Sequence, residues 1–475
     1  MCGIVAAAAE RDVVPILVAG LKALEYRGYD SAGLSVISSG ELHRARTVGK
    51  VRELELRLDS APLAGHTGIA HTRWATHGVP NETNAHPHLS AGTVSVVHNG
   101  IIENHAPLRS ELQALGYRFD SDTDTEVIAH LVHHLMRGGL GLREAVQAAI
   151  ARLHGAFAIA VISSDAPGHV IGARRGSPLC VGIGIGEHFL GSDVQALIKV
   201  TNQFVYLDEG DLVEITRTTM QVYDADGSPV ERRLHTSELS ADAVERGEYR
   251  HYMLKEIFEQ PRAVAETLEG RIAGGRILPN IFGVDAEALL ARVRHVQIVA
   301  CGTSYHAGLV ARYWLEGLAG IPCSIEVASE YRYRHAVVPA DSLFVAISQS
   351  GETADTLAAL REAKGKGARS LAICNVVGSM ATREAEGTIY THAGPEIGVA
   401  STKAFTTQLV ALYLLALRLA EVRGTLTEAE RRTAIEALMQ LPQVVERALQ
   451  ASRVTEDIAA RFHNRQDFLY LGRGI

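Results

Sequence analysis

The sequence predicts two domains of different fold class, an α+β layered domain followed by a doubly wound α/β domain. In the first half of the chain, short apolar runs are separated by glycine and polar turns, which is typical of strand-rich layers covered by helices. From residue 295 onward, short apolar runs alternate with helical stretches, which indicates a parallel sheet covered on both faces. A charged segment at 236–290 separates the two patterns.

The expected elements follow in chain order from these patterns. In the first half, apolar runs predict strands at 33–37, 68–72, 94–100, 156–164 and 204–216, a hairpin turn at 224–229, and helices near 12–25 and 124–137. In the second half, strands are predicted within 295–304, 322–330, 342–353 and 369–376, and an apolar helix at 403–421. These elements define domains at 2–235 and 291–425, helical connectors at 236–290 and 426–465, and a last strand within 466–475.

The composition is that of an ordinary globular protein. A net charge of −8 gives no support to binding of nucleic acid or of an anionic membrane. No apolar run reaches the roughly 18 residues of a membrane span, and the best stretch, 409–420, is expected to form a buried helix. We expect no signal peptide, and the five dispersed cysteines argue against disulfides or a zinc site, so the expected compartment is the cytoplasm.

Cys2 follows the initiator methionine and is small enough for that methionine to be removed. Removal would place an α-amine, which titrates near pH ~7.7–8.0, on the same residue as a thiol. The amine can then act as general base for the thiol, whose thiolate is the attacking form. On residues 1–3 alone, an ordinary apolar residue entering a strand is the simpler interpretation, and only the rest of the domain favours a nucleophile.

Acyl transfer also needs donors for the developing oxyanion and groups that hold the substrate. Asn99 and Gly100 end an apolar strand, where a side-chain amide and a backbone N–H can point at one oxygen, although a plain Asn-Gly turn is the more common case. Arg73 is suited to bidentate binding of a carboxylate. Asp124 can hold an ammonium group or cap a helix.

Histidines crowd the same region, and the sequence His-Pro-His at 86–88 invites a metal site. No acidic or cysteine ligands accompany it at a usable spacing, so structural or substrate-shaping histidines are the favoured interpretation and no metal is expected. The histidines are His66, His71, His77, His86, His88, His98 and His105.

Six motifs of the first half occur in an order that resembles the class II glutamine amidotransferases, whose N-terminal-nucleophile domain is a four-layer α/β/β/α sandwich. They are MCGIV, LEYRGYDSAG (24–33), HTRWATHG (71–78), NAHPH (84–88), VVHNGIIEN (96–104) and DTDTEVIAH (122–130). The resemblance implies ammonia release from glutamine, with Cys2 as nucleophile and Asn99 and Gly100 as oxyanion hole. It also implies glutamine contacts from Arg73, Thr76, His77 and Asp124, and an ammonia gate at Trp74.

The second domain lacks the glycine patterns of dinucleotide and nucleoside triphosphate sites. Instead, the strand at 343–347 ends in SQSGET (348–353), and a helix is expected to follow. Hydroxyls and backbone N–H groups at a helix N-terminus suit a phosphate, and Gly351 lets the backbone approach it; a hydroxyl-rich helix cap is the alternative. The first strand ends in a similar turn, CGTS (301–304), and doubly wound sheets bind ligands at such strand ends.

The second half resembles the sugar isomerase (SIS) domain through CGTS, SEYRYR (329–334), SQSGETADT (348–356), AICN (372–375) and EIGVASTKAFTTQ (396–408). With HYMLKEIFEQP (251–261) and the first half, the resemblance covers essentially the whole chain. It points to the glutamine–fructose-6-phosphate aminotransferases of bacterial type, the glucosamine-6-phosphate synthases. It implies that Thr303, Ser304, Ser348, Gln349, Ser350 and Thr353 hold the sugar phosphate, with Val399 lining the pocket.

The resemblance implies a reaction in two halves. Cys2 would attack the glutamine carboxamide, release ammonia and leave a glutamyl thioester for water to hydrolyse. The ammonia would pass Trp74 and add to C2 of open-chain fructose 6-phosphate, and a base would move a proton to give glucosamine 6-phosphate. The partners are then glutamine and fructose 6-phosphate, no organic cofactor is implied, and a homodimer is expected from the family.

The last residues resemble the start of a second SIS domain, which the family carries after the first. DFLYLGRGI (467–475) repeats the strand and glycine turn of HVQIVACGTS (295–304). We therefore expect a fragment that lacks most of that domain, together with the family's isomerising glutamate, histidine and lysine. The alternative function is a glutaminase and sugar-phosphate binder that forms no glucosamine 6-phosphate.

Overall fold

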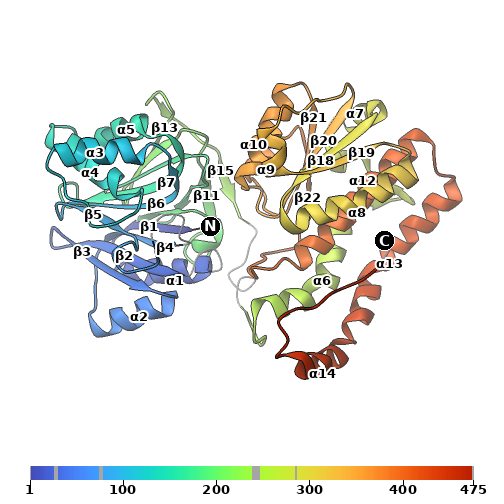
Figure 1. Cartoon of the computed structure of the whole chain (residues 1–475), viewed down its shortest axis with the longest axis horizontal. Coiled ribbons are helices and arrows are strands. Elements are labelled where there is room, and N and C mark those ends of the chain that lie inside the picture. The colour runs from blue at the N-terminus through green and yellow to red at the C-terminus, as the bar shows by residue number, and fades with distance from the viewer. Residues whose placement is uncertain (1, 26–29, 74–78, 238–245, 284–285, 473–475) are drawn as a thin grey trace. The chain divides into compact units, whose positions relative to one another are not determined.

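The computed structural model describes residues 2–25, 30–73, 79–237, 246–283 and 286–472. The chain divides into two compact units, Met1–Glu245 and Arg246–Ile475 (Figure 1). Each unit has its own sheets and its own apolar cores.

Two antiparallel sheets form the middle of the first unit. The strands of the first sheet are β1 (Gly3–Ala9), β2 (Ser31–Ser38), β3 (Glu41–Val48), β4 (Thr67–Arg73), β9 (Cys180–Ile183), β10 (Glu187–Gly191), β11 (Gln203–Tyr206) and β15 (Leu234–Thr236). Those of the second are β5 (His88–Ser90), β6 (Val94–Ile102), β7 (Gly155–Ser163), β8 (Val170–Arg175), β12 (Leu212–Ile215), β13 (Met220–Tyr223) and β14 (Pro229–Val230). Their orders are β15-β11-β9-β10-β1-β4-β2-β3 and β14-β13-β12-β8-β7-β6-β5.

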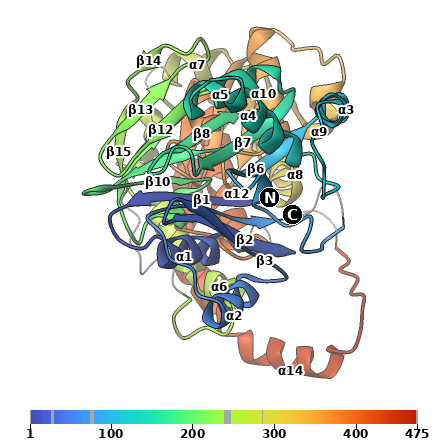
Figure 2. The same ribbon diagram turned by 90° about the vertical axis from the view of Figure 1, so that its left-hand side faces the viewer.

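Helices cover the outer faces of both sheets. α1 (Val14–Leu24) and α2 (Val51–Ser60) pack on the first sheet, whereas α3 (His105–Ala114), α4 (Glu126–Arg137) and α5 (Leu142–Arg152) cover the second (Figure 2). One apolar core lies between the sheets and includes Ile4, Ile69 and Val97. Another lies between the second sheet and its helices. The unit is therefore the four-layer α/β/β/α sandwich that the motifs predicted.

Sequence patterning predicted α1 and α4 but missed three other helices that the described residues form. The buried side chains explain the difference, because α4 buries seven consecutive residues, 126–132, whereas α2 and α3 bury two each. α5 buries four small or medium apolar residues. So few apolar positions do not stand out from a polar loop.

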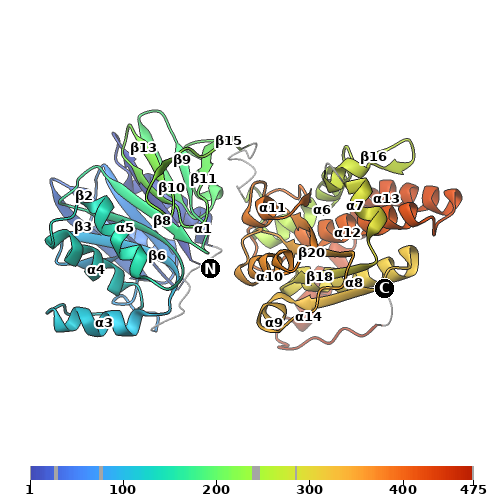
Figure 3. The same cartoon turned by 90° about the horizontal axis from the view of Figure 1, so that it is seen from above.

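A parallel sheet forms the middle of the second unit. Its strands are β18 (His295–Ala300), β19 (Cys323–Val327), β20 (Ser342–Ser348), β21 (Arg369–Cys374) and β22 (Gly387–Tyr390), in the order β19-β18-β20-β21-β22. α8 (Gly302–Ala319) and α12 (Lys403–Arg423) pack on one face, and α9 (Ala328–Tyr333) and α10 (Ala354–Gly365) pack on the other (Figure 3). The predicted doubly wound fold is confirmed. β22 and the short helix α11 (Met380–Glu384) lie where a loop was expected.

The apolar helix predicted at 403–421 is α12, which begins at Lys403 and continues two residues further than predicted, to Arg423. Among the described residues it is the one helix long and apolar enough to cross a membrane by length and composition. About two thirds of its most apolar window, 67%, is buried inside the protein. Its side chains pack in the core of the parallel sheet, as expected of a buried helix.

Further elements of the second unit lie outside its parallel sheet. They are α6 (Tyr252–Leu268), the hairpin of β16 (Ile272–Ala273) and β17 (Arg276–Ile277), α7 (Ala286–Arg292), α13 (Glu428–Leu449) and α14 (Ser452–Phe462). α6 packs against both α12 and α13. The strand expected within 466–475 is not formed over 466–472, which are exposed and irregular. A strand needs a neighbour for its backbone hydrogen bonds, and no described strand pairs with this segment.

Candidate functional site

The predicted nucleophile and the predicted oxyanion donors meet between the two sheets of the first unit. Cys2 leads directly into β1, and Asn99 lies on β6 of the other sheet. Asn99 Nδ2 donates a hydrogen bond of 3.1 Å to the Cys2 carbonyl oxygen. Gly100 follows with φ +129°, and a Cβ there would lie 2.0 Å from the Ala156 carbonyl oxygen. Only glycine fits this turn of the strand.

Two further predicted residues lie close to this point. Gly3 pairs with Thr72 in the antiparallel register of β1 and β4, so Cys2 lies beside the end of β4 where Arg73 is buried. Asp124 is buried just before α4, and its Oδ2 accepts the Ile102 backbone N–H at 2.7 Å. Ile102 ends β6, the strand that carries Asn99 and Gly100. Thr76, His77 and Trp74 lie outside the described residues.

The loop that carries Asp124 is held by a buried carboxylate. Glu126 Oε1 accepts the Asp120 N–H at 3.0 Å, and Oε2 accepts the backbone N–H and the hydroxyl of Ser121 at 2.8 and 2.7 Å. Burial raises the pKa of Glu126, but hydrogen bonds from His130, Asp120 and Ser121 outweigh it and lower that pKa to about 2. The carboxylate therefore stays ionised and fixes the loop.

The two histidines of the His-Pro-His sequence also contact this loop. His86 Nε2 lies 2.9 Å from Thr125 Oγ1, and His88 Nε2 lies 3.1 Å from Thr123 Oγ1. Burial lowers the pKa of His88 to about 3 and the pKa of His86 well below its usual value, so both rings are neutral. Within the described ranges, no group of three or more His, Cys, Asp or Glu side chains is arranged to hold a metal ion.

In the second unit, both predicted phosphate turns lie at one edge of the parallel sheet. The chain passes from β18 to β19 on one side and then crosses to β20 on the other, so its direction reverses between β18 and β20. Open α/β sheets bind ligands outside the carboxyl ends of the strands at this reversal point. Thr303 and Ser304 start α8 directly after β18, and Ser348 ends β20.

The turn after β20 is preformed by its own side chains. Ser348 Oγ accepts the Gly351 N–H at 3.0 Å and lies 3.0 Å from Thr353 Oγ1. Thr353 is the N-cap residue of α10, yet its side chain makes no capping hydrogen bond. The Thr353 hydroxyl therefore contacts Ser348 within the turn and does not cap α10, which argues against the alternative that these hydroxyls only cap a helix. Gln349 and Ser350 lie between them and are half-buried.

Val399 lies in the loop before α12, where its side chain is 78% exposed. Sequence reasoning missed the groups that hold this loop. Glu256 on α6 accepts the N–H groups of Ile397 and Gly398 at 2.5 and 2.9 Å through Oε1. Glu396 accepts the Thr402 N–H at 2.8 Å. A buried glutamate that reaches more than a hundred residues along the chain leaves no local pattern.

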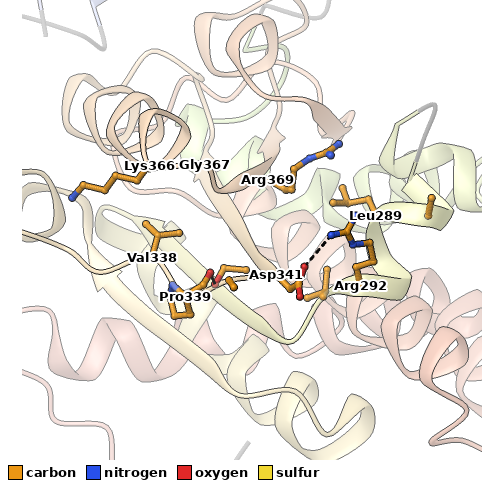
Figure 4. Close-up of a pocket in the computed structure, with 12 residues that line it drawn as sticks. Leu289, Arg292, Val338, Pro339, Asp341, Lys366, Gly367 and Arg369 are labelled. Carbon is orange, nitrogen blue, oxygen red and sulfur yellow. Dashed lines mark hydrogen bonds and ion pairs between the residues drawn. The ribbon is translucent and has the colours of Figure 1, made fainter.

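A hollow of about 380 Å³ lies at the opposite edge of the sheet, around the residues that precede β20 and β21 (Figure 4). Its basic side chains already have partners. Arg292 lies 3.5 Å from Asp341, Lys366 lies 2.6 Å from a carboxylate oxygen on its own helix, and Arg369 lies 2.8 Å from Glu386. Because it lies where these strands begin, the hollow is distinct from the turns at the carboxyl ends of the strands.

The fold and these two sites define a glutamine amidotransferase domain joined to a sugar isomerase domain. A family model described as a glutamine amidotransferase domain matches residues 71–199, and one described as an SIS domain matches residues 289–418. The chain is 58% identical to the glutamine–fructose-6-phosphate aminotransferase (isomerizing) of Pseudomonas putida and 54% identical to that of Haemophilus influenzae. Each comparison covers the whole of this chain and 78% of the relative.

The chain therefore belongs to the glutamine–fructose-6-phosphate aminotransferase (isomerizing) family. Among solved structures, the C-terminal domain of glucosamine-fructose-6-phosphate aminotransferase from Francisella tularensis is 48% identical. That comparison covers 46% of this chain and 62% of the other, with a TM-score of 0.45.

Proposed function

We propose that this chain transfers the amide nitrogen of glutamine to fructose 6-phosphate, the activity that its relatives are named for. The proposal assigns glutamine hydrolysis to residues 2–235 and sugar-phosphate binding to residues 291–425. The observation that carries it is the hydrogen bond from Asn99 to Cys2, which joins residues of two different sheets, with Gly100 next to Asn99 on β6. This contact supports the assignment of a nucleophile with two nearby oxyanion donors.

The first half-reaction uses the residues around Cys2. After removal of the methionine, the α-amine takes the thiol proton, and the thiolate attacks the carboxamide carbon. The carboxamide oxygen becomes an oxyanion that accepts hydrogen bonds from the Asn99 side-chain N–H and the Gly100 backbone N–H. The C–N bond then breaks, and the leaving nitrogen takes the proton from the α-ammonium group and departs as ammonia. Water hydrolyses the thioester to glutamate and regenerates the thiol. We assign the glutamine carboxylate to Arg73 and its ammonium to Asp124, with Thr76 and His77 as further contacts and Trp74 as the ammonia gate.

The second half-reaction uses the turns that follow β18 and β20. We assign the sugar phosphate to Thr303, Ser304, Ser348, Gln349, Ser350 and Thr353, with Val399 beside the sugar. Hydroxyls and the N-terminal N–H groups of α8 and α10 neutralise a phosphate without a lysine. Ammonia adds to C2 of the open-chain ketose, the resulting carbinolamine loses water to form an imine, and transfer of a proton from C1 to C2 gives glucosamine 6-phosphate. We further propose that the protein is a cytoplasmic homodimer.

The test measures glutamate and glucosamine 6-phosphate released by the purified chain. Cys2→Ala is expected to abolish glutamate release and to leave fructose 6-phosphate binding intact, because the nucleophile is lost and the sheet is not. Cys323→Ala is the matched control, since this buried cysteine lies in the other unit. Continued glutamate release by Cys2→Ala would show that the nucleophile is another residue.

The sugar site is tested separately by Ser348→Ala combined with Thr353→Ala. Loss of both hydroxyls should weaken fructose 6-phosphate binding at least ~10-fold, since each hydrogen bond to a charged group contributes about 1.5–3 kcal/mol. Glutamate release without sugar should persist. If the wild-type chain releases glutamate but forms no glucosamine 6-phosphate, the alternative function holds, namely a glutaminase that only binds the sugar phosphate.

A further inference from the structure

One buried contact of the first unit has no part in the proposed reaction, namely that between His71 and Asn99. His71 lies on β4, in register with Ile4 of β1 and Gly33 of β2. Side chains two residues apart on a strand share a face, so His71 points with Ile69 toward the second sheet. There it meets Asn99, and only 1% of His71 is exposed.

The partners of the His71 ring determine which nitrogen carries the proton. Nε2 lies 3.0 Å from the His98 carbonyl oxygen and 3.0 Å from Asn99 Oδ1. A backbone carbonyl only accepts, so Nε2 must be the protonated nitrogen. Nδ1 is buried without a partner among the described residues, and a second proton there would be an unpaired buried charge. Burial accordingly lowers the pKa of His71 to about 3 and keeps the ring neutral.

The His71 proton in turn determines the orientation of the Asn99 amide. Since Nε2–H must donate, the amide atom that faces it must be the oxygen. The amide nitrogen then faces the Cys2 carbonyl oxygen, to which it donates at 3.1 Å. A flipped amide would set two donors against each other at His71 and two acceptors against each other at Cys2, and both contacts would be repulsive.

We propose that His71 is a positioning residue that keeps the Asn99 amide turned with its N–H groups toward the acyl-transfer site. The inference rests on the proposed function, in which Asn99 stabilises the oxyanion. Without the His71 donor, the amide keeps only the Cys2 carbonyl oxygen to distinguish its two ends, so the flipped orientation is less strongly disfavoured. A flipped Asn99 presents oxygen to the developing oxyanion and opposes the reaction, although the fold and the thiol are unchanged.

A packing role for His71 is the competing explanation, because its ring lies 4.1 Å from that of His86, centroid to centroid. The two explanations differ in what a substitution changes. A residue that only packs affects stability and the shape of the pocket. A residue that orients the oxyanion donor affects the turnover step and leaves glutamine affinity unchanged.

The experiment compares three variants of the full chain. His71→Gln places a donor near the position of Nε2, His71→Asn places one near the position of Nδ1, and His71→Leu has none. We expect His71→Leu to lower the kcat of glutamine hydrolysis by about 10- to 100-fold. Removal of an oxyanion donor itself lowers kcat by ~10²–10³-fold, and the loss through a positioning residue should not exceed that. KM should stay within about twofold, and alkylation of Cys2 by iodoacetamide, which uses no oxyanion donor, should keep its rate.

Rescue decides between the two explanations. We expect His71→Gln to recover most of the lost kcat and His71→Asn to recover little. Equal kcat in the Gln and Asn variants would overturn the inference, even if His71→Leu failed to fold, and so would a loss confined to KM. The wild-type and Cys2→Ala chains serve as controls, because absence of Cys2-dependent glutamate release in the wild type would refute the proposed function instead.

Discussion

At the scale of the residue, Gly351 shows how little space the turn after β20 leaves. Its φ of +66° is one that side chains rarely adopt, and a Cβ would lie 2.0 Å from Ser379 Oγ. The glycine thus allows Ser379 to lie against the turn. Because the Gly351 N–H also donates to Ser348 Oγ, any shift of this residue displaces a proposed phosphate ligand.

Gly351→Ala is expected to lower the free energy of unfolding of the second unit by about 1–3 kcal/mol and to weaken fructose 6-phosphate binding at least ~10-fold. Gly365→Ala is the matched control, because that glycine is helical, exposed and has open space around it. The control should be neutral or stabilising by about 0.5–1 kcal/mol. Urea unfolding and sugar-phosphate titration measure both effects. An unchanged affinity in Gly351→Ala would remove the turn from the proposed site.

Residues of the site differ in how far a sequence can reveal them. Cys2, Asn99 and Gly100 were assigned roles through the ordered motifs around them, since the local context of each also fits an ordinary strand or turn residue. His71 was interpreted only as one of several structural or substrate-shaping histidines, and Glu256 was given no role, because their partners are 28 and more than 140 positions away. Nothing in their own neighbourhood distinguishes a ring or carboxylate that holds another residue from one that fills space.

At the scale of the element, α6 is the support for the loop that carries Val399. Glu256 accepts hydrogen bonds from two backbone N–H groups of the loop before α12. Two further side chains of α6 contact the first turn of α12, Glu259 through Lys403 and Gln260 through Thr406. Glu256 is 1% exposed, and burial raises its pKa despite these two hydrogen bonds. The helix was expected to be a connector, and its contacts add a positioning role.

We expect Glu256→Ala to destabilise the second unit by about 2–4 kcal/mol, because two buried N–H groups lose their acceptor. It should also weaken fructose 6-phosphate binding, since the loop with Val399 is released. Glu256→Gln keeps an acceptor oxygen of the same reach and should stay close to the wild type. Urea unfolding and sugar-phosphate titration distinguish the variants. Equal losses in Gln and Ala would mean that the negative charge, not the acceptor geometry, is what matters.

At the scale of the whole molecule, most of the described histidines whose pKa values are lowered by burial lie in the first unit, whereas His295 is the example in the second. His71, His86 and His88 of the first unit all have lowered pKa values, and the largest cause in each case is burial. Unfolding exposes them, and each then takes up a proton below its ordinary pKa near ~6.5. Between that pH and about 3 the unfolded chain binds more protons than the native one, so stability falls as the pH falls.

We therefore expect acidification from pH 7 to 5 to lower the unfolding midpoint of the first unit more than that of the second. Each such histidine contributes up to about 1.4 kcal/mol per pH unit below its ordinary pKa. Calorimetry measures the unfolding midpoint of each unit. Fructose 6-phosphate should raise the midpoint of the unit that binds it, which identifies the transition of the second unit. His88→Gln should reduce the pH dependence, whereas Gln at the exposed His154 should not. If the midpoints of the two units fell by the same amount between pH 7 and 5, the explanation from buried histidines would be wrong.

The fold class of both units was predictable because strand and helix periods persist over long segments. The order of strands was less accessible, since β1 pairs with β10 and β4 rather than with its neighbours in sequence. The segment 466–472 was predicted as a strand and is irregular here, because apolar alternation does not by itself supply the partner strand that pairing requires. Local pattern thus predicts which residues are able to pair, and tertiary contacts decide whether they do.

The pairing of β1 also bears on how the protein is made. The residues directly after Cys2 leave the ribosome first, yet Val5 of β1 is paired with Gly191 of β10. The strand that follows the proposed nucleophile therefore gains its second neighbour only when about four fifths of the first unit has been synthesised. Until then β1 has one unpaired edge, so we expect the proposed glutaminase activity of Cys2 to appear only once the first unit is complete.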